Sequence, residues 1–373
     1  HHNTINQNGG LDGAGGGVAL HTGSDSYQVT DNFVCGNFTT ADGAGIAHFG
    51  FSDLDQNVQN SAVPLIEGNT VIFNENFNQG ITVNGGGILV AGMPAFGCPI
   101  DPLTGVPDPA CLLDPEQVLS QGSGSVEIRG NLIKGNSAGV GDGAGIRLSR
   151  INGQDVSTQG GGQNPTVNVE WTIDVINNMI VDNMAALSGG GISLQDALDV
   201  DILHNTIANN DNASTSGDAF TTGIPSQSNA QPGAGIVSRA HSVELSQFLP
   251  VNAAGFSDAN LVDNIVWHNR KFFWLLDDAP IPAISGLCPD INGEVGLNCG
   301  LPTGNLPVYD DLAVIGTVGA LTCTDCILTD DADPAFVAEY VNGSRNTTTV
   351  ILEGTIQATP AFDEGGNFIR LRY

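Results

Sequence analysis

Three basic residues, Lys134, Arg147 and Arg150, form a modest cluster in a chain that has only 10 basic side chains. A lyase that removes a proton beside a uronate carboxylate needs a base and a cation that neutralises that carboxylate. Lys134, Arg147 and Arg150 are the candidates for these roles. A solvated salt bridge explains Arg147 equally well. A glycoside hydrolase would instead need two carboxylates at a set separation, and 40 acidic residues give no basis for choosing a pair.

The word Asp-Gly-Ala-Gly occurs three times and places Asp12, Asp42 and Asp142 in the same local context. Carboxylates stacked about 5 Å apart repel one another unless a cation lies between them. The three aspartates are therefore candidates for a row of Ca²⁺ ligands. Aspartate is also a common turn-forming residue, so a purely structural role at a bend stays open.

The seven cysteines suggest three local pairs and one remaining thiol. We predict disulfides Cys98–Cys111, Cys288–Cys299 and Cys323–Cys326, and a buried free thiol at Cys35. Short-range disulfides stapling loops are typical of proteins from oxidising compartments. The Cys-Thr-Asp-Cys word alone is weak evidence for zinc, which needs four ligands.

All of these residues lie within or beside a repeat, which has to be read before any local motif. In seven copies an asparagine is followed two places on by Ile or Val and five places on by another asparagine. The reference asparagines are Asn3, Asn32, Asn69, Asn131, Asn178, Asn205 and Asn264. Their separations are 29, 37, 62, 47, 27 and 59 residues, so the shortest represents one turn and the longer ones contain insertions.

A second word, Gly-(Ala or Gly)-Gly-(Ile or Val), follows six of the seven copies. Apolar residues alternate in short runs, which is the periodicity of strands, and Gly and Asn interrupt every long window. Short strands joined by tight bends can coil so that each turn stacks on the last, about 4.8 Å away. We expect the reference asparagines to form a structural hydrogen-bonded ladder at a bend, because asparagine tolerates the left-handed conformation of such corners.

The combined pattern resembles the right-handed parallel β-helix repeats of bacterial secreted and surface proteins, a fold shared with pectate-lyase-like enzymes. The resemblance covers roughly residues 1–275 and implies the fold more than the activity, since β-helices serve both as enzymes and as inert stalks. The words "DDADPAFV" at 330–337 and "TPAFDEGGNF" at 359–368 are similar to the closing segment of bacterial surface β-helix proteins that carry varied C-terminal anchors.

The resemblance and the repeats together predict an all-β fold with two parts. Residues 1–275 are expected to form a right-handed parallel β-helix with loop insertions, and 276–373 an irregular, disulfide-stapled C-terminal cap with degenerate turns. The first residue falls inside a repeat, so we expect sequence before it. An open first turn exposes unpaired strand edges, and a further segment or a partner is expected to cover them.

The formal charge of −30 indicates that the chain repels nucleic acid and anionic membranes. No apolar stretch is long enough to span a membrane. Because architectural residues dominate the repeat and the sequence shows no catalytic constellation, we expect a non-enzymatic, adhesin-like or scaffolding module outside the cell or at its surface. Its partners would be glycans or other domains or subunits of a surface assembly. A polysaccharide lyase or glycoside hydrolase, and a Ca²⁺-stabilised glycan-binding module, are the alternatives, and Ca²⁺ is the one cofactor with candidate ligands.

Overall fold

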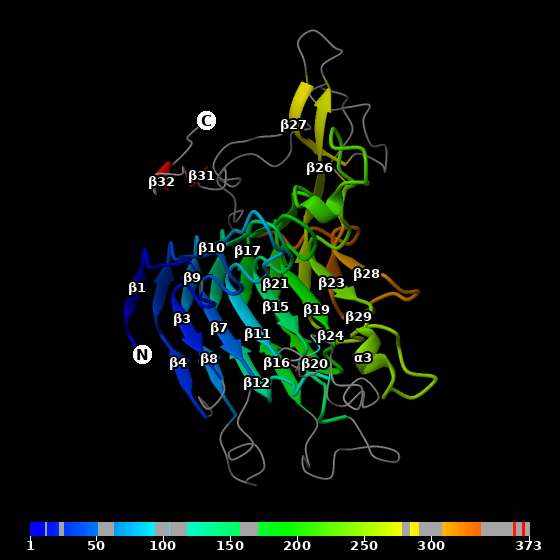
Figure 1. Ribbon diagram of the computed structural model, residues 1–373. Helices are drawn as coiled ribbons and strands as arrows, with labels where there is room; N and C mark the ends of the chain where they lie inside the picture. Colours follow the sequence, from blue (N-terminus) through cyan, green and yellow to red (C-terminus); the bar gives the residue numbers. More distant parts are fainter. Residues whose placement is uncertain are drawn as a thin grey trace.

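The computed structural model describes residues 1–11, 13–21, 26–50, 63–93, 104, 118–156, 171–277, 284–290, 308–336, 361–362 and 368–369. The described chain is all-β with almost no helix, and most of its strands belong to four long sheets in which successive repeats pair in parallel. The chain visits the four sheets in turn and then returns to the first (Figure 1). We name them sheets A to D in the order in which the chain enters them.

Sheets A and B contain the strands that follow the two repeat asparagines. Sheet A consists of β1 (Thr4–Asn6), β5 (Phe33–Cys35), β9 (Thr70–Ile72), β13 (Leu132–Lys134), β17 (Met179–Val181), β21 (Thr206–Ala208), β25 (Ile265–Trp267) and β30 (Ile327–Leu328). Sheet B consists of β2 (Gly9–Gly10), β6 (Phe38–Thr39), β10 (Glu75–Asn76), β14 (Ser137–Ala138), β18 (Met184–Ala185), β22 (Asp211–Asn212), β26 (Arg270–Asp277) and β27 (Ile284–Pro289).

Sheets C and D contain the strand of the glycine-rich word and the strand that leads back to the next asparagine. Sheet C consists of β3 (Val18–Leu20), β7 (Ile46–Phe49), β11 (Ile88–Ala91), β15 (Ile146–Ser149), β19 (Ile192–Gln195), β23 (Ile236–Arg239) and β28 (Leu312–Ile315). Sheet D consists of β4 (Gln28–Thr30), β8 (Leu65–Glu67), β12 (Val126–Arg129), β16 (Thr172–Ile176), β20 (Asp199–Leu203), β24 (Asn260–Val262) and β29 (Cys323–Thr324).

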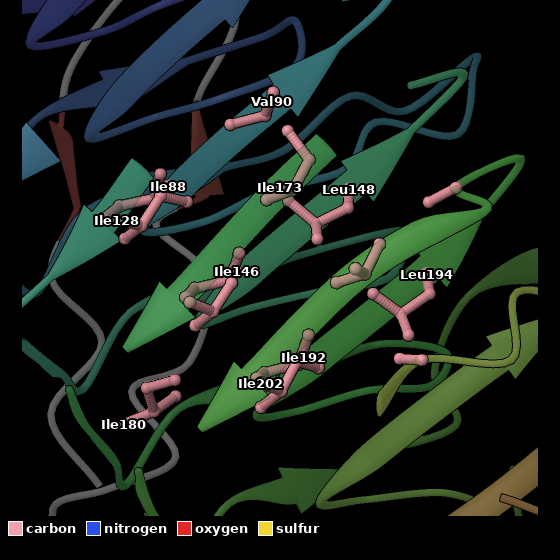
Figure 2. Close-up of a cluster of buried hydrophobic side chains, with 14 of the residues drawn as sticks. Ile88, Val90, Ile128, Ile146, Leu148, Ile173, Ile180, Ile192, Leu194 and Ile202 are labelled. Carbon is pink, nitrogen blue, oxygen red and sulfur yellow. The ribbon is translucent and has the colours of Figure 1, made fainter. Parts of the chain in front are cut away.

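The core consists of Ile, Val and Leu side chains that point inward from sheets A, C and D. In sheet A, Val71, Ile133 and Ile180 are in register on neighbouring strands, and each is completely buried. Figure 2 shows the same stacking for isoleucines of sheets C and D, such as Ile146 and Ile128. Each buried aliphatic side chain contributes about 1.5–3 kcal/mol, so identical inward residues in each turn supply most of the apolar stabilisation.

The bend that leads into sheet A contains a left-handed residue in every turn. This residue comes directly before the reference asparagine: His2, Asp31, Gly68, Gly130, Asn177, His204 and Asp263 all have φ between 54° and 66°. The sequence had suggested that the asparagine itself takes this conformation. The preceding position takes it instead, and this explains why that position holds Gly, Asn, Asp or His, the residues that adopt positive φ most readily.

The glycine-rich word is needed because consecutive turns approach very closely there. A Cβ added at Gly87 would lie 2.6 Å from the carbonyl oxygen of Gly145 in the next turn. Any larger residue would force the two turns apart. The glycines therefore hold the turns at strand spacing where sheet B passes into sheet C.

The parallel sheets continue past residue 275, in the part of the chain where degenerate turns were expected. Strands β28, β29 and β30 pair in parallel with β23, β24 and β25. Cys326 lies one turn beyond Asn264, with Asp325 (φ 54°) in the left-handed position before it. Residues 323–328 are therefore an eighth copy of the asparagine word, in which cysteines replace both the inward aliphatic residue and the asparagine.

A few elements depart from the stack. Strand β26 begins in sheet B and then pairs antiparallel with β27, so that the hairpin projects away from the stack (Figure 1). A short 3₁₀ helix η2 (Gly217–Ala219), helix α3 (Val243–Ser246) and the small antiparallel pair β31 (Ala361–Phe362) and β32 (Phe368–Ile369) complete the described elements. Within the described ranges, no helix is both long enough and apolar enough to cross a membrane.

Candidate functional site

The two asparagine ladders are the most regular polar feature of the chain. Asn131 shows the pattern: its Nδ2 donates to the Ile66 carbonyl of the turn before (2.9 Å) and to Asn178 Oδ1 of the turn after (3.0 Å). Its own Oδ1 accepts from the backbone N–H and Nδ2 of Asn69. A parallel ladder runs through Asn74, Asn136 and Asn183 with the same geometry. Each inner asparagine thus satisfies its amide group completely.

The three basic residues singled out in the sequence are not brought together. Arg147 and Arg150 lie in and just after β15 of sheet C, while Lys134 belongs to sheet A and forms an ion pair with Asp182 (3.3 Å). Arg150 has a φ of 54° and is half-buried at the end of its strand. The three side chains therefore come from two different sheets.

Arg147 is instead the centre of a buried charge cluster on the outer side of sheet C. Its Nη1 and Nη2 donate to Ser193 Oγ (2.6 Å) and Gln195 Oε1 (2.8 Å) on the adjacent strand. Asp142 Oδ2 lies 3.7 Å from Nη1, and the two side chains are only 5% and 4% exposed. Burial lowers the pKa of the Arg147 guanidinium, Asp142 opposes this, and the nearby Arg239 adds to the lowering.

Asp142 also forms an ion pair with Arg239, a residue that no sequence motif singled out. Arg239, two turns further along sheet C, binds both carboxylate oxygens of Asp142, with Nη2 2.8 Å from Oδ1. Burial disfavours the charged Arg239, but the carboxylates of Asp142 and Asp218 favour it, and the pKa of Arg239 is raised overall. The separation of 97 positions between Asp142 and Arg239 hid the pair. Counting two repeats on from the glycine-rich word would have placed Arg239 on sheet C two turns beyond Arg147, at the register position of Ser149.

Asp42 and Asp142 occupy the same bend position, but they are not adjacent. Asn84 belongs to the turn between them, and each of these side chains accepts a hydrogen bond from the backbone N–H of the next turn. Burial raises the pKa of Asp42, partly offset by the Asn84 bonds and by Arg147 and Arg150. The expected row of neighbouring carboxylates is thus interrupted by an amide. Asp12 lies outside the described residues.

His241 and Asp196 form a second, smaller polar pair beyond the end of sheet C. Nδ1 of His241 lies 3.4 Å from Asp196 Oδ1, and both side chains are almost fully buried. Asp196 also accepts from the backbone N–H of Ser242 (2.7 Å), which begins helix α3. Within the ranges the structure covers, no group of three or more His, Cys, Asp or Glu side chains could hold a metal ion.

Of the predicted cysteine pairs, Cys323 and Cys326 lie within disulfide distance, with their Cα atoms 5.7 Å apart. Cys98, Cys111 and Cys299 lie outside the described residues, and Cys288 is buried in β27. Cys35 is a free thiol on the outer side of sheet A, half-buried rather than buried as expected. Burial raises its thiol pKa, which disfavours the reactive thiolate.

These contacts make the Arg147 cluster an internal ion-pair network. Asp142 is held by two guanidinium groups and by the Ser188 N–H. A polysaccharide chain could reach neither Arg147 nor Asp142 without moving the residues that bury them. The network connects three turns of sheet C, so its evident effect is to hold those turns together.

No protein-family model matches the chain, and neither a curated protein nor a solved structure matches it.

Proposed function

We propose that the four sheets wind into a right-handed parallel β-helix and that this coil serves as a non-enzymatic structural module outside the cell or at its surface. Parallel strands joined by crossovers are right-handed in nearly all proteins, which supports the handedness. The observation that carries the functional proposal is the pair of ladders, which ties every inner turn to both of its neighbours.

The distribution of charge supports the same proposal. Arg147, which departs from its repeat position, and Arg239 both form ion pairs with Asp142. A lyase or hydrolase would need such groups to face a substrate. The remaining negative charge is suited to a solvated surface that contacts other domains, subunits or glycans through its loops.

The test is a screen of the purified chain for release of reducing or unsaturated ends from neutral and uronate-containing polysaccharides. Arg147→Gln and Lys134→Gln variants are assayed beside it. We expect no release by any of the three. Specific release that Arg147→Gln abolishes and Lys134→Gln retains would overturn the proposal in favour of a carbohydrate-active enzyme.

A thermal melt with Ca²⁺ and with chelator addresses the remaining alternative. A ligand that binds only the folded state raises the melting temperature. We expect no shift in the melting temperature when chelator replaces Ca²⁺. A fall of several degrees with chelator would favour a Ca²⁺-stabilised binding module over a plain coil.

A further inference from the structure

Lys271 lies at the base of the β26–β27 hairpin, where the chain leaves sheet B (Figure 1). On one side it is in parallel register with Asn212 of the preceding turn. On the other side the antiparallel pairing of the hairpin ends at Phe272 and Pro289. One step further, the Asp290 N–H donates to the Lys271 carbonyl (3.0 Å). The main chain therefore holds Lys271 and Asp290 opposite each other, as cross-strand neighbours.

The Lys271 amine contacts two carboxylates. Its Nζ lies 3.4 Å from Asp290 Oδ2 and 3.0 Å from Asp310 Oδ2. Asp310 comes from the segment before β28, where its backbone N–H donates to the Asn269 carbonyl (2.8 Å). Burial disfavours the charged Lys271 amine, but the carboxylates of Asp310 and Asp290 favour it, and the pKa of Lys271 is raised overall. The resting group is therefore an ammonium between two carboxylates.

The two carboxylates differ in their surroundings. The Asp290 side chain is 4% exposed, whereas the side chains of Lys271 and Asp310 are each 18% exposed. Oδ1 of Asp290 is buried and has no hydrogen-bond partner among the described residues. A buried carboxylate with an unsatisfied oxygen is costly, because it has lost its hydration without full replacement. Conversion of Asp290 to an amide would remove that charge, while Asp310 lies nearer to solvent and can carry a proton.

We propose that Lys271 and Asp290 form an intramolecular amide bond and that Asp310 transfers the protons. Asp310 accepts a proton from the Lys271 ammonium and passes it to the Asp290 carboxylate. The lone pair of Nζ then attacks Cγ of Asp290 and forms the C–N bond. Asp310 takes a second proton from Nζ and delivers it to the hydroxyl group on Cγ, whose C–O bond breaks to release water. One ammonium and one carboxylate thus become one amide and one water molecule, and no further reactant is needed.

The amide would close a ring over residues 271–290 at the base of the hairpin. Without it, the hairpin is joined to this turn of sheet B by hydrogen bonds and ion pairs that can open together. With it, unfolding of the hairpin could not separate Asp290 from the strand that pairs with sheet B. This inference goes beyond the structural role proposed above and does not depend on the handedness of the coil.

The test is the mass of the purified full chain, measured after its disulfides are reduced and the chain is denatured. We expect a mass lower than that of the sequence by one water molecule. Trypsin should fail to cleave after Lys271, because its amine is no longer free. Fragment ions of the resulting peptide should place the missing water at a link between Lys271 and Asp290.

Lys271→Arg keeps the positive charge but has no amine to form this bond, so that variant should have its full sequence mass. Lys134→Arg is the matched control, because Lys134 pairs with Asp182 (3.3 Å) on sheet A, and it should keep the loss of water. Asp310→Asn should leave most chains unreacted.

Full sequence mass in the unmodified chain, in a sample that unfolds cooperatively in urea, would overturn the inference. Loss of water that persists in Lys271→Arg would also overturn it, as would a link from Lys271 to Asp310 in place of Asp290. Complete reaction of the Asp310→Asn variant would contradict the proton transfer assigned to Asp310.

Discussion

The inner and outer faces of one sheet follow different rules. On the inner face of sheet C, Ile46, Ile88, Ile146, Ile192 and Ile236 repeat the same residue in five consecutive turns. One position along, on the outer face, the register contains Ala47, Leu89, Arg147, Ser193 and Val237. Inward side chains meet the same neighbours above and below in every turn, so each turn needs the same residue.

Each outward side chain is stabilised by its own local contacts, and these contacts differ from turn to turn. Leu89 packs with Ala47 in a small apolar cluster, while Arg147, one turn on, is neutralised by Asp142 and bonded to Ser193. The comparison teaches that the inner face and the ladders maintain the architecture. The residue types of the outer face vary because each outward side chain is stabilised by its own neighbours.

The largest effect is expected from a carboxylate placed in a ladder. Asn178→Asp removes the amide that donates to Ile128 and Asn205, and leaves a buried charge facing two acceptors. A buried uncompensated charge costs about 3–5 kcal/mol. The neighbouring Asn177→Asp is the control, because residue 177 is exposed and aspartate occupies the same position at Asp31. Urea unfolding is expected to separate the two variants, and equal stabilities would argue against the ladder.

The inner core is expected to be next in sensitivity. Ile133→Ala should cost about 2–5 kcal/mol because Ile133 is completely buried between Val71 and Ile180. Ile176→Ala makes the same chemical change on the outer side of sheet D, where the side chain is half-buried, and should cost clearly less. Chemical denaturation of the two variants checks this, and a larger loss for Ile176→Ala would reverse the assignment of faces.

On the outer face, Asp142→Asn is expected to cost about 2–4 kcal/mol, because it leaves the buried Arg147 and the half-buried Arg239 without their carboxylate. Asp42→Asn should be neutral or slightly stabilising. Asn84 already serves at the equivalent position, and burial raises the pKa of Asp42. Thermal melts of both variants at neutral pH measure the contrast. A destabilisation confined to Asp42→Asn would contradict the proposed network.

Glu75 on sheet B gives the outer face a pH dependence. Burial raises its pKa from 4.5 to about 8, and its Oε1 has no hydrogen-bond partner among the described residues. The folded state then binds the proton more tightly than the unfolded state, so stability falls as the pH rises from about 4.5 to about 8. Glu75→Gln should flatten this decline and be the more stable protein, by on the order of 1–3 kcal/mol, at pH 8. Unfolding midpoints measured across this range test the sign, with Glu244→Gln as a control that should leave the decline in place.

The smallest effect is expected where the repeat is restored in its eighth copy. Cys323→Ile with Cys326→Asn removes the disulfide, worth about 2 kcal/mol for so short a loop, but returns the aliphatic residue and the ladder amide. We expect a net change of less than about 1 kcal/mol. The double variant Cys323→Ser and Cys326→Ser, which loses the disulfide without that return, should be less stable by denaturant unfolding. A restored variant no better than the serine variant would show that Cys326 is not in the ladder.

The features that recur in every turn could be predicted from the sequence, and the features that depart from the repeat could not. Spacing alone identified the reference asparagines, the inward Ile and Val residues and the glycine-rich word, because each recurs in the same environment. It missed β28 and the copy at Cys326, since there Asp311 and two cysteines replace the diagnostic residues. It also missed Arg239, because two residues 97 positions apart show no shared local pattern. Lys134 was grouped with Arg147 by nearness in sequence, which a bend between two sheets does not preserve.

The most direct measurement is hydrogen exchange of the asparagine side-chain amides in a sample labelled with ¹⁵N at asparagine. Buried ladder residues such as Asn131, Asn136 and Asn178 donate both in-register bonds, so their Nδ2 protons should exchange far more slowly than those of the exposed Asn6. Cooperative loss of that protection on unfolding would support the coil. Ladder amides that exchange as fast as Asn6 would contradict it, and with it the structural role proposed for the chain.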